Sequence, residues 1–279
     1  MKERQSTVQS MPVRPHVSMA VGTRIMSNAL TRKLESYEPL SPEDRHALDA
    51  LVPKVRQVGA RVDLIREGDE PENVLLILDG FACRYKVLPD GQRQIMAYLV
   101  PGDFCDLNVF ILDQMDHNIG TISQCQVVDI PRKAIDEIST RHPSVTRAFL
   151  WCALVDGAVL REWLVNMGVR PPNQRIAHLF CELHSRLEVV GRVADDSYAF
   201  PFTQTEIAET MGLSNVHVNR TIRELKALNL IRIKGRVLTI LDVERLKDYC
   251  RFTPNYLHLR NTRWGERRDV AWPGQTAVG

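Results

Sequence analysis

The spacing of apolar residues divides the chain into segments of different character. Between about residues 58 and 131, short apolar runs alternate with turn signals at intervals typical of all-β proteins. In chain order these are RVDLI then EGD, NVLLIL then DG, FACRYKVL then PDG, QRQIMAYLV then PGD, and finally GTISQCQVVDI. Short strands punctuated by Gly, Pro and Asp predict a β-sandwich or barrel.

After Pro131 the apolar spacing becomes helical, and a long helix is predicted from His142-Pro143 to about Val169. Its apolar residues cover nearly the whole circumference, so the helix must be buried on two sides. One side is expected to pack on the β-body and the other to meet a second subunit, with a central helix of a monomeric core as the alternative. The two stripes are Val145, Phe149, Cys152, Val159 and Trp163, and Leu150, Leu154, Leu164 and Met167.

The segment 201–240 carries the most specific signal. Thr203 and Glu206 form a capping box that opens a short helix, which ends at Gly212. Ser214 then caps a second amphipathic helix, and LIRIKGRVLTI reads as a hairpin turning at Lys234-Gly235. This pattern predicts a winged helix-turn-helix that binds DNA, whereas a helical hairpin within a bundle would not need a basic outer face. The candidate DNA-binding residues are Thr203, Gln204, Ser214, Asn215, Val216, His217, Asn219, Arg220, Arg223, Lys234 and Arg236.

Charge is distributed unevenly along the chain and supports this interpretation. Residues 214–236 hold six Lys/Arg against one Glu, residues 1–33 also carry +5, and residues 34–213 carry −10. An acidic body with a basic working face is typical of a protein that binds nucleic acid, although a chance cluster on a solvated surface is the simpler alternative.

A β-roll, a long helix and a C-terminal winged helix resemble the cyclic AMP receptor protein/Fnr (Crp/Fnr) family of bacterial transcription regulators. The likeness rests on FTQTEIAETMGLSNVHVNRTIRELKALNLI and on the roll landmarks EGD, DG, PDG and PGDF. It implies an α+β fold and a homodimer that binds inverted-repeat promoter DNA and contacts RNA polymerase. The expected divisions are a flexible N-terminal arm (1–30), a sensor-like roll (31–142), a dimerisation helix (143–170), a winged helix-turn-helix (171–250) and a C-terminal tail (251–279).

The resemblance also assigns one base contact. In the family, the arginine at the position of Arg220 contacts a guanine of the half-site. The arginine and glutamate that the cyclic AMP receptor carries early in the same helix are replaced here by Asn215 and Val216, and the Fnr-type glutamate is missing. The sequence therefore predicts one G·C contact and leaves the remaining operator bases open.

The family's nucleotide motif is altered in PGDFCDLNVFILDQMDHNIG. The positions that would need a glycine, a ribose-binding glutamate and an arginine–serine pair hold Asp106, Leu107, and approximately His117 and Asn118. Without a fixed cation for the phosphate, cyclic AMP binding is not expected. This degenerate effector pocket is assigned no cofactor.

A redox- or haem-responsive regulator of the same family remains the alternative. Cys83, Cys105 and Cys125 fall in the roll, where buried inert thiols are the simpler interpretation, and His117 is a haem-ligand candidate only by its position. The Fnr iron–sulfur site is not expected, because no cysteine precedes Cys83.

Other classes of protein are disfavoured. A cupin-like jelly-roll enzyme would need a His-x-His pair, and the eight histidines include none, so no catalysis and no metal are expected. No apolar run is long enough for a membrane span, and no secretion signal is recognisable. The six cysteines are widely spaced and form no CxxC pair, which argues against a structural zinc or iron–sulfur site. A cytoplasmic protein is expected.

Overall fold

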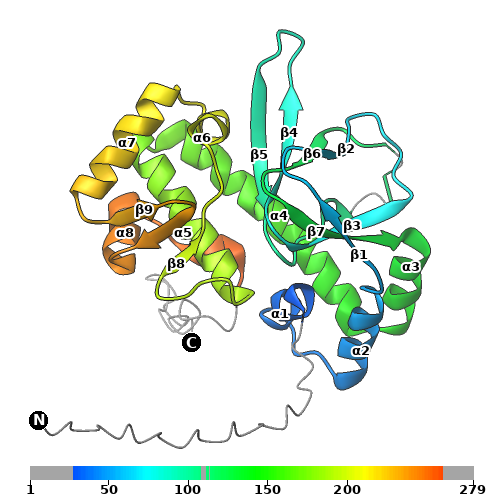
Figure 1. Ribbon diagram of the computed structural model, residues 1–279. Coiled ribbons are helices and arrows are strands. Elements are labelled where there is room, and N and C mark those ends of the chain that lie inside the picture. The colour runs from blue at the N-terminus through cyan, green and yellow to red at the C-terminus, as the bar shows by residue number, and fades with distance from the viewer. Residues whose placement is uncertain (1–27, 108–110, 113, 260–279) are drawn as a thin grey trace, which may run out of the picture.

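A computed structural model describes residues 28–107, 111–112 and 114–259. Two antiparallel sheets form the roll, one with strand order β1-β7-β3 and the other with order β2-β6-β4-β5 (Figure 1). The strands are β1 (Val55–Val58), β2 (Asp63–Ile65), β3 (Asn73–Asp79), β4 (Ala82–Val87), β5 (Arg93–Leu99), β6 (Asn118–Thr121) and β7 (Cys125–Pro131).

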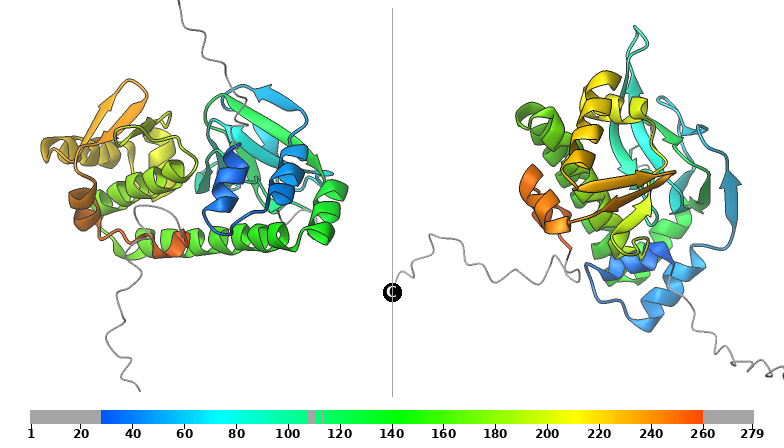
Figure 2. Two further views of the ribbon diagram at one scale, coloured as in Figure 1. Left: turned by 90° about the horizontal axis from the view of Figure 1, so that it is seen from below. Right: turned by 60° about the vertical axis from the view of Figure 1, so that its left-hand side comes forward.

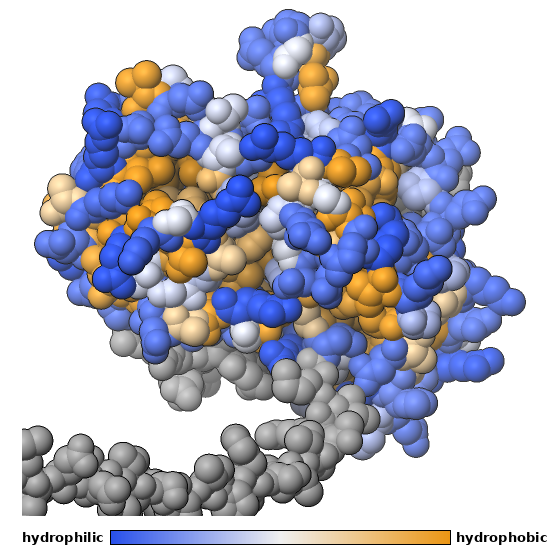
Figure 3. Space-filling view, in the orientation of Figure 1, coloured by the Kyte–Doolittle hydropathy of each residue, from blue (hydrophilic) through white to orange (hydrophobic). Residues whose placement is uncertain are grey.

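The turn signals of the sequence shape this roll. Gly68, Gly80, Gly91 and Gly102, one from each landmark, all have positive φ angles between 84° and 91°. At Gly80 a Cβ atom would lie 2.2 Å from the backbone oxygen of Gln124, so a side chain cannot fit there. The predicted β-roll is confirmed, and the β4–β5 hairpin projects from its body (Figure 3).

Helices link the roll to the rest of the chain. Helix α1 (Ala29–Glu35), which the sequence did not reveal, and α2 (Pro42–Ala50) precede the roll, and α3 (Arg132–Arg141) follows it. Helix α4 (Pro143–Val169) then runs along both the roll and the C-terminal part (Figure 2). None of the helices in the described ranges is long and apolar enough to cross a membrane.

The two apolar stripes of α4 have different surroundings. All five members of the stripe from Val145 to Trp163 are buried. In the second stripe, Leu150, Leu154 and Leu164 remain 60, 62 and 69% exposed. The helix therefore has one face packed on the core and one apolar face open within the single chain.

The C-terminal part is a winged helix. Helix α5 (Pro172–Val189) is followed by β8 (Ser197–Ala199), α6 (Gln204–Met211) and α7 (Asn215–Ala227). Strands β9 (Ile231–Lys234) and β10 (Val237–Ile240) form the wing in a sheet of order β8-β10-β9, and α8 (Val243–Cys250) closes the domain. The α+β prediction is confirmed.

The predicted tail begins later than expected. Residues 251–259 include the 3₁₀ helix η2 (Pro254–Leu257), and Tyr256 and Leu257 are 8 and 2% exposed. The Tyr256 hydroxyl donates to Glu182 Oε2 of α5 at 2.9 Å. Apolar burial thus holds this segment against the domain, so the assignment of 251–259 to the C-terminal tail was wrong. The rest of that tail (260–279), and residues 1–27 of the predicted arm, lie outside the described residues.

Candidate nucleic-acid interface

The helix-turn-helix is built by the capping signals read from the sequence. Thr203 Oγ1 accepts from the backbone N–H of Glu206 at 3.1 Å, and Glu206 Oε2 accepts from the backbone N–H of Thr203 at 2.7 Å. Gly212 ends α6 with φ 60°, in the left-handed region, and the side chain of Ser214 caps α7. These local interactions fix the turn between α6 and α7.

Helix α7 has an apolar inner face and a polar outer face. Val218 and Leu225 are fully buried, and Thr221 is 3% exposed. The outer face holds Asn215, Val216, His217, Arg220 and Arg223, all exposed, together with the half-buried Asn219. The structure therefore brings six of the predicted DNA-binding side chains onto one helix with its outer face open to solvent.

Two of these side chains are oriented by α6. Asn219 Nδ2 donates to Gln204 Oε1 at 3.3 Å, and Asn215 Nδ2 donates to Thr205 Oγ1 at 3.4 Å. Because two of the amides on α7 are tied to the start of α6, the two helices present one continuous polar surface. Thr205 was not predicted as a site residue, although its place at the start of α6 beside Gln204 was a signal for it.

The positive charge on the outer face of α7 comes from Arg220 and Arg223, both of which are exposed. Among the residues that the structure describes, neither Arg220 nor Arg223 forms an ion pair. Glu224, one turn beyond Arg220, instead accepts from Asn173 Nδ2 and from the Tyr249 hydroxyl, at 3.0 and 2.9 Å. These two hydrogen bonds, together with the nearby charge of Arg220, hold the pKa of Glu224 below its ordinary value. The guanidinium groups are thus left available for an anionic partner.

The wing places its two predicted cations differently. Strands β9 and β10 pair Lys234 with Val237, with Gly235 at φ 60° in the turn, and Lys234 is exposed. Arg236 is also exposed but lines a cavity together with Asp79 and Gly80 of the roll. Lys234 is therefore open to solvent at the tip, while Arg236 lies near the roll.

Of the four positions in the degenerate effector pocket, two line a common cavity. This cavity of about 390 Å³ lies between the roll and α4 and is lined by Asp106 and His117. Leu107 is buried elsewhere, and Asn118 donates to the backbone oxygen of Tyr85 and accepts from the backbone N–H of Glu67. The family's nucleotide-binding positions therefore do not converge here.

An arginine that sequence reasoning missed also lines this cavity. Arg84 of β4 forms an ion pair with Asp156 of α4 at 2.8 Å and donates to the backbone oxygen of Cys105 at 2.8 Å. Burial disfavours its charge, but the attraction of Asp156 and Asp106 and the hydrogen bond to Asp156 together outweigh burial and raise the pKa of Arg84. Arg84, the buried cation that β4 contributes to this cavity, is thus already paired with helix α4.

The cysteines of the roll are buried. Burial raises the pKa of Cys83 to about 12 and that of Cys125 to about 11, and it raises the pKa of Cys105 as well. Since the thiolate is the reactive form, these three thiols are poorly suited to redox chemistry. The described residues contain no cluster of three or more His, Cys, Asp or Glu able to hold a metal ion.

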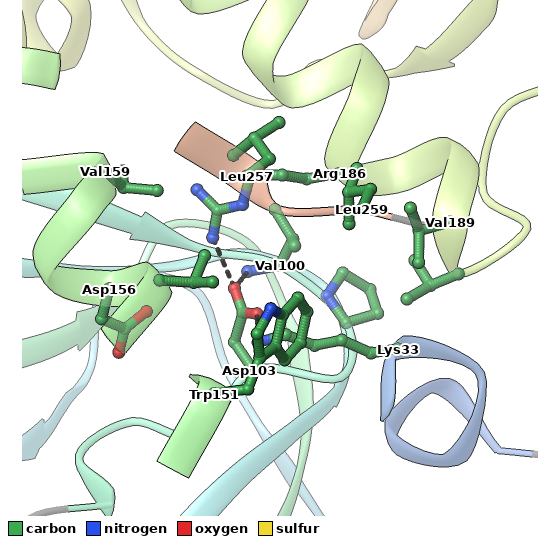
Figure 4. A pocket seen from close by; sticks show the side chains of 13 residues that line it. Lys33, Val100, Asp103, Trp151, Asp156, Val159, Arg186, Val189, Leu257 and Leu259 are labelled. Atoms are coloured by element: carbon green, nitrogen blue, oxygen red, sulfur yellow. Dashed lines mark hydrogen bonds and ion pairs between the residues drawn. The ribbon is translucent and has the colours of Figure 1, made fainter. Parts of the chain in front are cut away.

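The roll and the winged helix are joined by long-range polar contacts. The Tyr98 hydroxyl of β5 lies 2.6 Å from Thr210 Oγ1 of α6, and Arg93 forms an ion pair with Glu209 at 3.1 Å. A second junction surrounds Asp103, beside a small cavity of about 40 Å³ (Figure 4). The orientation of α6 relative to the roll is therefore set by specific side chains.

Asp103 is the centre of that second junction. Its two carboxylate oxygens lie 2.6 Å from Lys33 Nζ of α1 and 2.6 Å from an Arg186 nitrogen of α5. The three side chains are 5, 15 and 14% exposed, respectively. One buried carboxylate thus ties the N-terminal helix, the roll and the winged helix together.

Comparisons with known proteins agree with this architecture. A cyclic nucleotide-binding domain model matches residues 55–142, and a Crp-like helix-turn-helix domain model matches residues 174–249. The nitrogen fixation regulation protein FixK of Bradyrhizobium diazoefficiens is 28% identical over 173 residues, which cover 61% of this chain and 71% of that protein. The transcriptional activatory protein AadR of Rhodopseudomonas palustris is 26% identical over 227 residues, covering 80% and 92%.

A solved structure shows the same fold. FixK2 from Bradyrhizobium japonicum has a TM-score of 0.64 at 21% identity, over 71% of this chain and 97% of that one. The order of the two matched domains is also the order of the roll and the winged helix described above. The chain belongs to the Crp/Fnr family of transcription regulators, with a cyclic-nucleotide-binding-like roll and a helix-turn-helix DNA-binding domain.

Proposed function

We propose that the chain binds inverted-repeat promoter DNA as a homodimer, with α7 in the major groove and Lys234 of the wing on the phosphates. The observation that carries this proposal is the outer face of α7, where Arg220 and Arg223 are exposed and form no ion pair with the described residues. Guanidinium and amide groups on a helix are the types that read base edges. RNA polymerase is the expected protein partner by family, and the bacterial cytoplasm the place of action.

The exposed stripe of α4 supports dimerisation. Leu150, Leu154 and Leu164 fall on one seam of a heptad pattern, with the small Gly157 between them. Pairing two such helices would bury the three leucines of each subunit, a gain of roughly 1–2 kcal/mol per side chain. The helix thus offers a two-fold interface parallel to its own length.

A charge placed on this stripe tests the interface. Leu154→Glu is expected to give a monomer in sedimentation velocity and to weaken operator binding by at least about tenfold, because a dimer engages two half-sites at once. Leu88→Glu, at the tip of the β4–β5 hairpin and 56% exposed, is the matched control and should remain dimeric. A dimeric Leu154→Glu protein would contradict the interface.

We also propose that cyclic AMP does not control this binding. Leu107 stands where the ribose-binding carboxylate would be needed, and Arg84 is held by Asp156. No phosphate-binding cation is then left at the expected position of the motif. Gel shift of the purified protein on selected DNA should give the same affinity with and without cyclic AMP, and a large increase on its addition would refute this part.

The base-reading role of α7 is tested at Arg220. Arg220→Ala is expected to cost about 1–3 kcal/mol of specific binding and to relax the preference at one base pair. Arg141→Ala, which removes the same charge from an exposed position on α3, serves as the control. Unchanged affinity and specificity of the Arg220 variant would show that α7 does not dock as proposed.

A further inference from the structure

Val216 is the apolar side chain on the outer face of α7, and the fold of the chain does not use it. It is 77% exposed, whereas Val218 and Leu225 of the same helix are fully buried. An apolar side chain held in water at the start of a helix contributes nothing to the core. Burying Val216 can therefore stabilise only a complex in which a binding partner covers this side chain.

The neighbours of Val216 define the kind of partner. Positions three and four residues further along a helix share its face, and these are Asn219 and Arg220. Asn219 is hydrogen-bonded to Gln204 at 3.3 Å, and Asn215, directly before Val216, is bonded to Thr205. Val216 is thus an apolar side chain within a surface of oriented amides, beside the exposed guanidinium of Arg220.

We propose that Val216 reads a thymine of each half-site through the 5-methyl group of that base. The inference rests on the proposed binding of α7 in the major groove. Of the four bases, only thymine presents a methyl group in that groove, beside its O4 acceptor, while the other three offer a valine no methyl group to cover. The apolar spot on α7 therefore matches one base.

Helix geometry places this thymine relative to the guanine assigned to Arg220. The four residues between Val216 and Arg220 correspond to about 6 Å along the helix axis. A strand of DNA rises about 3.4 Å per base pair, so the two contacts lie roughly two base pairs apart. The thymine is therefore sought within two base pairs of the guanine whose recognition is lost in Arg220→Ala.

Replacing thymine by uracil isolates the methyl group. The full-length protein first selects its operator from random DNA, and each thymine of the half-site is then changed in turn to uracil. At one position the substitution should weaken binding about fourfold per half-site, the effect of burying one methyl-sized group. Uracil at the other thymines should change the affinity less than twofold.

Variants connect this loss to Val216. Val216→Ala should bind the thymine operator more weakly and no longer distinguish uracil from thymine at that position. Val55→Ala, at an exposed valine of β1, is the matched control and should retain the full uracil penalty. Val216→Glu should shift the base selected at that position towards cytosine, whose amino group a carboxylate accepts from.

The outcomes separate the two proposals. A selected operator that loses no affinity with uracil at any position, or a uracil penalty that persists in Val216→Ala, overturns the thymine contact and leaves DNA binding intact. If Val216 instead contacts a protein partner, replacing thymine by uracil in the selected DNA will likewise leave the affinity unchanged at every position. Failure of the wild-type chain to enrich any sequence refutes the proposed function itself.

Discussion

Replacing Asp103 by Asn should destabilise the protein far more than the loss of a surface ion pair. The substitution keeps the size of the side chain but removes the charge that pairs with both Lys33 and Arg186, each 2.6 Å away, and leaves Arg186 its second ion pair, with Glu182. Burial alone would raise the pKa of Asp103, but the attraction of Lys33 and Arg186 outweighs burial and lowers it. The carboxylate is therefore charged in the folded protein at neutral pH.

The magnitude follows from the burial of the three groups. With charges about 4 Å apart and an effective dielectric constant near 20, each pair attracts by about 4 kcal/mol, against which stands the cost of removing the charges from water. Asparagine would leave Lys33 without its ion-pair partner and Arg186 with only Glu182, 3.2 Å away, and it would turn an amide N–H₂ group towards one of the two cations. The expected loss in free energy of unfolding is about 3–5 kcal/mol, as for other buried pairs that lose one member.

Urea unfolding followed by tryptophan fluorescence measures this loss, because Trp151 lines the same cavity as Asp103. The midpoint of Asp103→Asn should fall by about 1–2 M. Asp129→Asn is the matched control, since its ion pair with Arg56 is also 2.6 Å long but both side chains are about 40% exposed. The control should lose less than about 1 kcal/mol. Equal losses in the two variants would refute the argument from burial.

Two further predictions concern other contacts between distant parts of the chain. Burial opposes the charge of Asp44, but a hydrogen bond from Ser144 and other contacts outweigh it and lower the pKa of Asp44 from 3.8 to about 2. The lowered pKa contributes about 1–2 kcal/mol to the free energy of unfolding above pH 4, and this contribution is lost as the pH falls towards 2. The urea midpoint of the wild type should therefore fall across that range more steeply than the midpoint of Asp44→Asn. Tyr98→Phe removes the 2.6 Å hydrogen bond to Thr210 and should lower the free energy of unfolding by about 1 kcal/mol, which corresponds to a fall of about 2–4 °C in Tm. An unchanged Tm would show that this bond does not hold α6 on the roll.

The elements that the sequence predicted were those with local signals. The capping box from Thr203 to Glu206 and the glycine at 212 specify the helix-turn-helix within a dozen residues, so that motif could be recognised from sequence alone. Helix α4 was predicted because its two apolar stripes repeat over 27 residues. Local periodicity and capping thus account for most of the fold.

The features that were missed depend on contacts between residues far apart in the chain. Helix α1 has only seven residues, and η2 only four, too few to show a helical period. Arg93 and Glu209 are separated by 116 positions, and nothing local in either segment signals their pairing. For the candidate site, the exposed residues of α7 were deduced from spacing, but the bond between Asn215 and Thr205 requires the packing of two helices.

The packing of η2 bears on the spacing of operator half-sites. Leu257 lies with Val155 and Val159 of α4 around one cavity, while Tyr256 is bonded to Glu182 of α5. The segment η2 thereby joins α4 to the domain that carries α7. In the proposed dimer, which pairs along α4, the protein itself would set the separation of the two α7 helices. Each base pair inserted between half-sites rotates one of them by about 35° around the duplex. A rigid dimer could bind such a site only if the DNA twisted to realign the half-sites, and that twisting costs binding free energy. Promoters with the wrong spacing would therefore bind weakly even when both half-sites have the preferred sequence.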